Sequence, residues 1–322
     1  MKIAVTGGAG FIGSVFLWKL NMQGIKDIIV VDVGYKAKDS ANIKGKNITA
    51  YIERDDFRRL IGTGRMDDAI DVIVHLGACA DTTQTDSKYL DHNNFLYTKE
   101  LALWSIKNNK PFYYASSAAT YGSGELGYSD DDSSTLKLQP LNEYGRSKHK
   151  FDLWVLDNKI ADRVVGFKFF NVYGPNEYHK QDMRSMINKG YYQIKETGRL
   201  KLFKSYKPEY ADGGQMRDFV YVKDVVDIMW FFLSNPGKRG IYNVGTGRAY
   251  TWNELARALF KALGKEPVIE YIDMPQNIKQ QYQYFTKAVI AKLRSAGCDH
   301  SFMDMDKAVK DYAGYLGSGK YL

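Results

Sequence analysis

Tyr144 and Lys148 are the first residues in this 322-residue sequence whose types and spacing could do chemistry. On a helix, a spacing of four places both side chains on one face. A lysine ammonium near a phenol favours the phenolate, so we expect a lowered pKa for Tyr144 and proton exchange with a substrate hydroxyl. Such pairs are common on helix surfaces. The chemical interpretation is favoured by the stretch 116–122, because a serine at the end of a strand expected at 112–115 can bond the same reacting oxygen.

A glycine-rich turn lies near the start of the sequence. Its glycines stand at positions 7, 10 and 13, directly after the apolar run 2–6 and at the start of a helical pattern over 11–22. Such glycines permit a tight turn and a close approach of backbone N–H groups to a pyrophosphate, and the helix N-terminus adds partial positive charge. The order of strand, glycine turn and helix predicts a dinucleotide site.

The acidic residue expected at the adenosine ribose is Asp32, which follows the apolar run 28–31 nineteen positions after Gly13. A carboxylate at this place bonds the ribose hydroxyls and favours NAD. Lys36 and Lys38 lie just beyond it and can hold a ribose 2′-phosphate. These residues therefore leave both NAD and NADP open.

Several further elements must position these residues. Short runs rich in valine and isoleucine alternate with segments of helical period, which predicts βαβ units in a Rossmann-type, doubly wound parallel sheet of the α/β class. The expected strands are 2–6, 28–31, 72–76, 112–115 and 164–169, followed later by 218–222 and 240–244. The expected helices are 11–22, 94–108, 142–158 and 252–263.

The sequence changes character after Gly174. Residues 175–215 are polar, rich in tyrosine and lysine, and without clear alternation. We therefore assign residues 1–170 to an NAD(P)-binding Rossmann core, to which about 216–247 return. Residues 171–215 and 248–322 are assigned to a smaller α/β substrate-binding domain.

The charge, the apolar stretches and the cysteines of the sequence indicate which classes of partner to expect. Lys plus Arg number 45 and Asp plus Glu 37, and the net charge of +8 suits an anionic partner. The basic residues are scattered rather than clustered, which argues against nucleic acid. The most apolar stretch, 228–233, is too short to span a bilayer. The two cysteines, Cys79 and Cys298, form neither a disulfide framework nor a zinc pattern, so we expect no metal site and a soluble, cytoplasmic protein.

In order and spacing, these motifs resemble the extended short-chain dehydrogenase/reductase family. Further similar stretches are 75–78, 93–94, 217–225 and 243–247, so the resemblance covers nearly the whole chain. In the family the catalytic serine directly precedes an Ala-x-x-Tyr-Gly segment, which selects Ser117 beside Tyr144 and Lys148. The resemblance implies these cofactor-binding residues: Gly7, Gly10, Phe11, Ile12, Gly13, Asp32, Val33, Lys38, Arg54, Leu76, Gly77, Ala78, Cys79, Ala80, Asn93, Lys148, Val172 and Lys180.

Within that family the finer resemblance is to the ADP-L-glycero-D-manno-heptose 6-epimerases. It rests on residues 77–79, 114–122, 170–175, 179–180, 201–203 and 282–286, and the segment around Lys180 is the most telling because it lies outside the dinucleotide motifs. The resemblance implies that Lys180 is a second catalytic acid/base, alongside Tyr144. It also implies these substrate-binding residues: Ser117, Asn171, Asp182, Lys189, Phe203, Lys204, Ser205, Arg217 and Tyr282.

Some positions depart from the heptose epimerase pattern. Asp182 and Lys189 stand where a serine and a histidine contact the substrate, and Gln181 stands where a glycine is usual. Arg54 replaces a cofactor lysine, and another such lysine is displaced by one position onto Lys38. These changes leave the epimerase chemistry in place and bear on the identity of the nucleotide-sugar.

The implied reaction removes a hydride from C6 of the heptose to NADP, giving a transient ketone that is reduced on its other face. Tyr144 and Lys180 would serve the two stereochemical modes. The resemblance further implies a role in lipopolysaccharide core biosynthesis and a homo-oligomer, with a pentamer as the candidate form. Two alternatives stay open: another NAD(P)-dependent nucleotide-sugar epimerase or reductase of the same fold, and a cofactor-binding regulatory module, which would have no need of the serine, tyrosine and lysine.

Overall fold

The central element of the fold is a parallel sheet of seven strands. The computed structural model describes residues 1–279 and 282–322, without the side chains of residues 35, 36, 277 and 278. The side chain of Lys36, a candidate cofactor residue, therefore lies outside the described part. In spatial order the strands are β3 (Ala50–Glu53), β2 (Ile28–Asp32), β1 (Ile3–Thr6), β4 (Val72–His75), β5 (Phe112–Ser117), β6 (Val164–Phe169) and β11 (Gly240–Val244).

Every residue of β1, β4, β6 and β11 is buried, as apolar runs covered on both faces of a parallel sheet should be. Alternate side chains enter two separate clusters. On one face the strands pack with α1 (Phe11–Met22) and α8 (Val222–Ser234). On the other they pack with α2 (Arg54–Gly62), α4 (Tyr97–Lys107) and α6 (Glu143–Asp157). The doubly wound fold predicted from the sequence is thereby confirmed.

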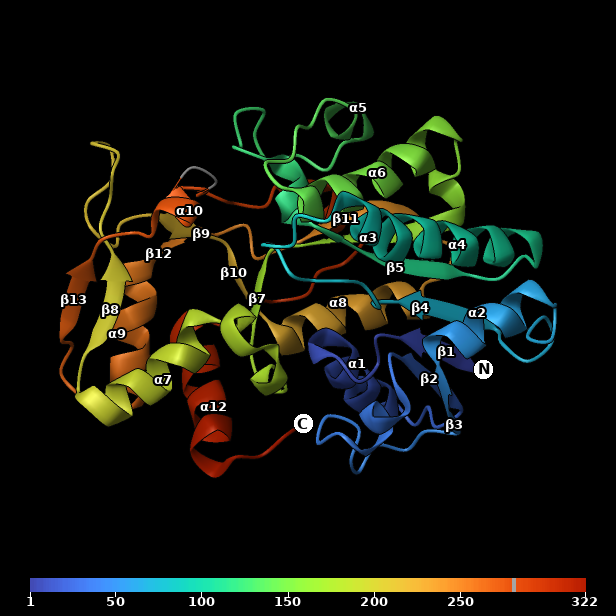
Figure 1. Cartoon of the computed structure of the whole chain (residues 1–322), viewed down its shortest axis with the longest axis horizontal. Coiled ribbons are helices and arrows are strands. Elements are labelled where there is room, and N and C mark those ends of the chain that lie inside the picture. Colours follow the sequence, from blue (N-terminus) through green and yellow to red (C-terminus); the bar gives the residue numbers. More distant parts are fainter. Residues whose placement is uncertain (280–281) are drawn as a thin grey trace.

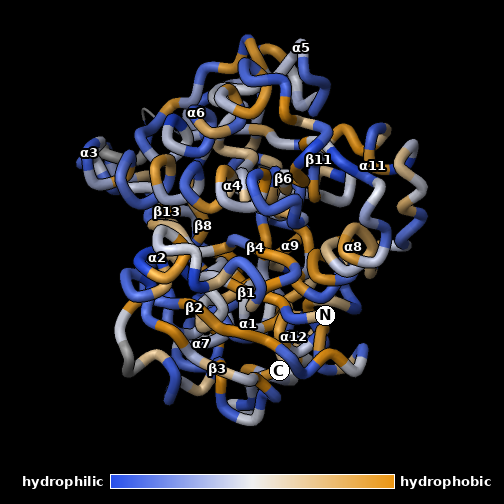
Figure 2. The backbone as a smooth tube through the Cα atoms, turned by 90° about the vertical axis from the view of Figure 1, so that its right-hand side faces the viewer, coloured by the Kyte–Doolittle hydropathy of each residue, from blue (hydrophilic) through white to orange (hydrophobic). Residues whose placement is uncertain are grey.

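Figure 1 shows this sheet with its helices on the right and a second group of elements on the left. That group contains β8 (Leu200–Phe203) paired in parallel with β13 (Ile269–Ile272), and helices α7 (Met186–Thr197), α9 (Trp252–Ala262) and α12 (Met305–Ser318). Two short ladders lie between the groups: β7 (Asn171–Tyr173) with β10 (Phe219–Tyr221), and β9 (Met216–Arg217) with β12 (Tyr250–Thr251). In Figure 2, the stretches along β1 and β2 have the colour of hydrophobic residues, and hydrophilic stretches lie mostly at the outside of the molecule.

The remaining elements are short. They are the helices α3 (Ser87–Leu90), α5 (Asp132–Thr135), α10 (Gln276–Lys279) and α11 (Ala291–Ser295), the 3₁₀ helices η1 (Tyr35–Asp39), η3 (Ala118–Tyr121), η4 (Ala161–Arg163) and η5 (Tyr178–Met183), and the π-helix η2 (Asp91–Leu96). No helix in the described ranges is long and apolar enough to cross a membrane. Within the same ranges, no group of three or more His, Cys, Asp or Glu residues is placed to hold a metal ion.

The expected elements agree with the structure most closely in the core. The predicted strands 164–169 and 240–244 and the helix 11–22 have the bounds of β6, β11 and α1. The predicted helix 94–108 was wrong at its start, where a π-helix precedes α4. The strand expected at 218–222 is shorter, because Val222 already begins α8. In 175–215, for which no helix or strand was predicted, the structure contains α7 and β8.

Candidate active site

The glycine turn between β1 and α1 forms a cradle of backbone N–H groups. Gly7 has a φ of +67°, and a Cβ on Gly13 would stand 2.1 Å from the carbonyl oxygen of Gly7. The N-cap of α1 is Gly10, which supplies no side-chain cap, and the first turn has no acidic residue. The first N–H groups of the helix have no intrahelical partner and stand at the lining of a cavity. The turn therefore fits a phosphate group.

Asp32 stands at the carboxyl end of β2, beside this turn. Its carboxylate accepts hydrogen bonds from the backbone N–H groups of Ala9 and Val33, both at 2.8 Å. Burial raises the pKa of Asp32, and these hydrogen bonds oppose the rise. Arg54 also lines the cavity and donates to Asn93 at 2.7 Å, whereas Lys38 is exposed and does not contribute to the lining.

The start of α6 brings Tyr144 against the end of β5. Asn142 caps the helix by accepting from the N–H of Gly145 at 2.7 Å. A Cβ on Gly145 would lie 2.8 Å from the carbonyl oxygen of Ala119, so glycine permits this close approach. As a result, the side chain of Ser117 hydrogen-bonds Tyr144.

The protonation of this pair differs from the expectation. The ammonium of Lys148 donates to the carbonyl of Ala115 at 3.0 Å, and burial lowers its pKa to about 8 against the attraction of Asp152. The pKa of Tyr144 is raised by burial, which the hydrogen bond to Ser117 opposes. The predicted lowering of the tyrosine pKa was therefore wrong for this structure, because desolvation outweighs the favourable contacts.

Lys180 reaches the cavity from η5. Its ammonium lies 5.1 Å from the ring centre of Phe11, the first residue of α1. Burial lowers the pKa of Lys180, the nearby charge of Lys189 lowers it further, and Glu177 opposes the change. Gln181, which follows, has φ +47° and ψ −122°, a backbone conformation that favours glycine.

Most of the predicted site residues line one cavity of about 990 Å³. From the predicted cofactor set, the lining includes all residues except Lys38. From the catalytic set it includes all four, namely Ser117, Tyr144, Lys148 and Lys180. From the substrate set it includes Asn171, Lys189, Phe203 and Tyr282 as well as Ser117.

The other predicted substrate residues lie outside the lining. Asp182 is exposed, and its carbonyl accepts from Lys189 at 3.1 Å. Lys204 forms an ion pair with Asp273 at 3.2 Å, and the N–H of Ser205 donates to Asp212 at 2.7 Å.

Arg217 is buried behind Tyr282. Its guanidinium donates to the backbone carbonyls of Met216 and Gln283 and lies 5.0 Å from the ring centre of Tyr282. In this arrangement Arg217 holds the Tyr282 segment and does not reach the cavity. These backbone partners could not be predicted from the sequence, because they depend on the tertiary structure.

Sequence reasoning did not single out several residues of the lining. On the substrate side they include Arg184, Gln193 and Trp252, whereas Met183, Lys201 and Gln283 had been noted only as parts of motifs. His179 also lines the cavity, although it had been noted only as part of a motif. A usable signal existed for α7, because the buried Ile187, Gly190, Tyr191 and Ile194 recur at helical spacing.

Comparison with known proteins shows to which family the chain belongs. Residues 3–245 match the NAD dependent epimerase/dehydratase family. The chain belongs to this family. The family is NAD dependent, which supports a nicotinamide dinucleotide as the cofactor.

Individual members of the family are similar over almost the full length. An ADP-L-glycero-D-manno-heptose-6-epimerase of Nitratidesulfovibrio vulgaris is 51% identical over 96% of this chain and 95% of its own length. One of Fusobacterium nucleatum is 49% identical over 96% of each chain. Among solved structures, the ADP-L-glycero-D-manno-heptose-6-epimerase of Helicobacter pylori superposes with a TM-score of 0.79 at 26% identity, covering 98% of this chain and 96% of that one.

Proposed function

We propose that the protein is an ADP-L-glycero-D-manno-heptose 6-epimerase, which inverts C6 of ADP-D-glycero-D-manno-heptose. The observation that carries the proposal is the convergence of two acid/base groups, Tyr144 and Lys180, on the cavity that holds the dinucleotide turn. The similarity to family members of that name supports the same substrate. A bound nicotinamide dinucleotide supplies hydride acceptance and hydride return at C6.

The two acid/base groups come from opposite faces of the central sheet. Tyr144 stands on α6, which packs in one hydrophobic cluster, and Lys180 lies over Phe11, which packs in the other. An epimerase needs proton transfer at the C6 oxygen in two stereochemical modes. Two groups on different sides of a cavity meet that need, whereas a one-directional reductase needs only one.

Each residue has a role in moving the proton of the C6 hydroxyl. Tyr144 exchanges this proton, and Ser117 donates to the reacting oxygen. Lys148, when charged, stabilises the phenolate of Tyr144. Burial lowers the pKa of Lys180, which makes it a better proton acceptor than an ordinary lysine.

The cofactor is proposed to be NADP, with NAD as the alternative. Arg54 lines the cavity near the adenosine end, and its guanidinium suits a 2′-phosphate. Lys38 lies six positions after Asp32 in the sequence. Asp32 favours a free ribose hydroxyl instead. Measuring the dissociation constants of NADP and NAD for the protein and for Arg54→Gln separates the two: NADP preference should fall at least tenfold in the variant, and an unchanged ratio would favour NAD.

The proposal extends to the protein's setting. Four members of the predicted substrate set, Asp182, Lys204, Ser205 and Arg217, contribute only if the cavity closes around the nucleotide-sugar, whereas the other members already line it. The protein acts in the cytoplasm in lipopolysaccharide core biosynthesis, without nucleic acid or a membrane as partner. It forms a homo-oligomer, with a pentamer as the candidate form.

The decisive experiment is incubation of the cofactor-loaded protein with ADP-D-glycero-D-manno-heptose, followed by NMR of the C6 configuration. Both C6 epimers should be present at equilibrium, without net change in the nicotinamide absorbance. An unchanged sugar would reject this substrate. Stoichiometric consumption of reduced cofactor would indicate a reductase instead.

A further inference from the structure

Asn42 lies at the centre of a buried bridge between the glycine turn and the segment that carries Lys180. The side chain is 4% exposed. Its amide nitrogen donates to the carbonyl of Ala9 at 2.9 Å and to that of Asn176 at 3.2 Å, and it also lies 3.2 Å from Nδ1 of His179. One amide thus joins a residue of the turn to residues just before Lys180.

The two ends of the Asn42 amide differ in their hydrogen bonding. The nitrogen donates to two backbone carbonyls, which an apolar side chain would leave without this donor. The amide oxygen is buried and has no hydrogen-bond partner among the described residues. The contribution of Asn42 is therefore the connection between these two carbonyls.

Asn176 forms the second connection of the bridge. It is fully buried, has a φ of +74°, and donates from its side chain to the hydroxyl of Ser14 at 3.0 Å. Ser14 lies in the first turns of α1 and donates to the carbonyl of Phe11 at 3.0 Å. The segment before Lys180 is therefore fastened to the same helix that begins at the glycine turn.

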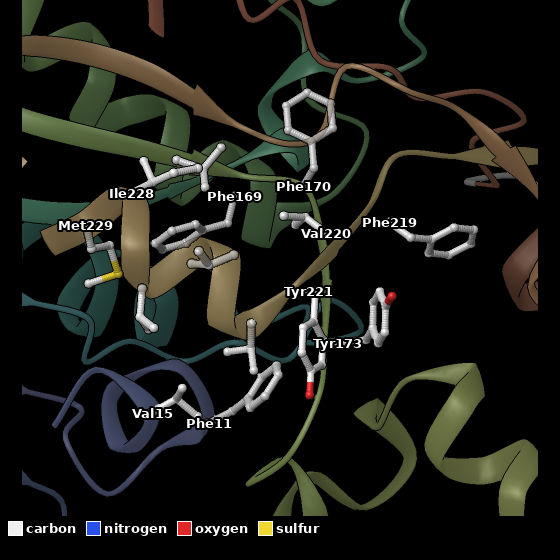
Figure 3. Close-up of a cluster of buried hydrophobic side chains, with 14 of the residues drawn as sticks. Phe11, Val15, Phe169, Phe170, Tyr173, Phe219, Val220, Tyr221, Ile228 and Met229 are labelled. Carbon is white, nitrogen blue, oxygen red and sulfur yellow. The ribbon is translucent and has the colours of Figure 1, made fainter. Parts of the chain in front are cut away.

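Phe11 forms the third connection, because its ring lies beneath the ammonium of Lys180. The ring is 8% exposed and is fixed in the hydrophobic cluster. Figure 3 shows Phe11 and Val15 projecting from α1 into this cluster, which also holds Tyr221. The support under Lys180 therefore belongs to the dinucleotide part of the fold.

We propose that Asn42 and Asn176 are positioning residues that fix Lys180 relative to the glycine turn, and through it to the reacting carbon. The inference rests on the proposed function, in which Lys180 is an acid/base. Displacing such a group by about 1 Å can cost a hundredfold in rate. The bridge ties the position of Lys180 to the turn that holds the cofactor, so that both meet the substrate in one fixed geometry.

The main test is a double-mutant cycle between Asn42→Ala and Lys180→Met on the cofactor-loaded protein. Asn42→Ala should lower kcat for C6 epimerisation about 10- to 100-fold, with the dissociation constant of the cofactor changed less than threefold. In the Lys180→Met background the same change should cost almost nothing further, because the bridge acts through that lysine. A full, additive loss in both backgrounds would overturn the proposal, and so would an unchanged kcat.

Two further variants test whether a general loss of structure explains the result. Ser14→Ala removes the partner of Asn176 and should reproduce the direction of the Asn42→Ala effect on kcat. Asn21→Ala is the matched control, because Asn21 also joins two backbone carbonyls, those of Ile25 and Asn47, away from the cavity. It should leave kcat within twofold of wild type; a loss equal to that of Asn42→Ala would contradict the proposal.

A readout independent of turnover separates this inference from the proposed function. The Cε resonance of Lys180, assigned by its absence in Lys180→Met, reports the lysine pKa in carbon-13-labelled protein. In Asn42→Ala the pKa should rise toward the ordinary lysine value, because a released side chain leaves its desolvated place. An unchanged titration would overturn the bridge. If the wild type does not epimerise the sugar, the proposed function is rejected, and the pKa of Lys180 in Asn42→Ala still tests the bridge.

Discussion

The two sides of the cavity are built in different ways. On the dinucleotide side, Asp32, Ser117 and the glycine turn stand at the carboxyl ends of strands of one parallel sheet, and the sheet itself brings them together. On the substrate side, Lys180 lies in a 3₁₀ segment between Asn176 and Gln181, both with positive φ, and is held by side-chain hydrogen bonds to distant parts of the chain.

This difference separates what the backbone determines from what side chains determine. Backbone hydrogen bonds between paired strands align the strand ends with one another. The substrate side has no such frame. Glu177, for example, is fully buried and binds Ser185 and Tyr312, so a single carboxylate holds the loop of Lys180 against α7 and α12. Substitutions should therefore act locally on the first side and spread on the second.

The largest effect is expected for Tyr144→Phe on the dinucleotide side. The phenol oxygen is the group that exchanges the proton, and its loss should lower kcat about 10³- to 10⁴-fold. Cofactor affinity should change little, because the turn and Asp32 are intact. NMR of the C6 configuration gives the rate, and cofactor titration gives the affinity; near wild-type turnover would exclude Tyr144 from the chemistry.

Lys180→Met tests the substrate side, with an expected fall in kcat of about 10²- to 10³-fold at unchanged fold. Methionine keeps most of the packing over Phe11 and removes only the proton-transfer group. Circular dichroism and thermal unfolding check the fold. A variant that epimerises at the wild-type rate would return Lys180 to a structural role.

The pH dependence sharpens the account of the dinucleotide side. Because burial lowers the pKa of Lys148 to about 8, raising the pH through 8 neutralises the ammonium that stabilises the phenolate. kcat/KM should therefore fall about tenfold per pH unit above this value. In Lys148→Arg the charge persists, so the residual activity should lack this alkaline limb. A limb at the same pH in both proteins would assign it to another group.

The smallest effect is expected at Gln181. Its φ of +47° and ψ of −122° are costly for a residue with a Cβ, so Gln181→Gly should raise the free energy of unfolding by about 1 kcal/mol. The neighbouring, exposed Asp182 lacks a positive φ, and Asp182→Gly should lower it by about 0.5–1 kcal/mol. Urea unfolding measures both. Equal losses in the two variants would show that the strain at Gln181 is not real.

The sequence predicted the dinucleotide side better for physical reasons. The bounds of β6 and β11 agreed because their residues are apolar and buried on both faces, which leaves an unambiguous run. The pair Tyr144 and Lys148 was recognisable because helical spacing places both on one face and the serine stretch 116–122 follows an expected strand. Neither statement requires knowledge of distant contacts.

On the substrate side the same reasoning reached only part of the site. Arg217 was expected to bind the substrate, yet its guanidinium is engaged by two backbone carbonyls that only the folded chain brings to it. The connection from Asn42 to Asn176 spans 134 residues of sequence, and no periodicity predicts such a contact. What local pattern could not supply was the long-range hydrogen bonding.

The most direct test of the central claim is the epimerisation of ADP-D-glycero-D-manno-heptose in D₂O, with NMR of the isolated product. If Tyr144 and Lys180 move only the hydroxyl proton while the carbon-bound hydrogen is returned as hydride, the product has inverted C6 and keeps its original hydrogen there. Inverted product with deuterium at C6 would contradict the account, because it requires exchange of the carbon-bound hydrogen with solvent, and so would recovery of the sugar unchanged.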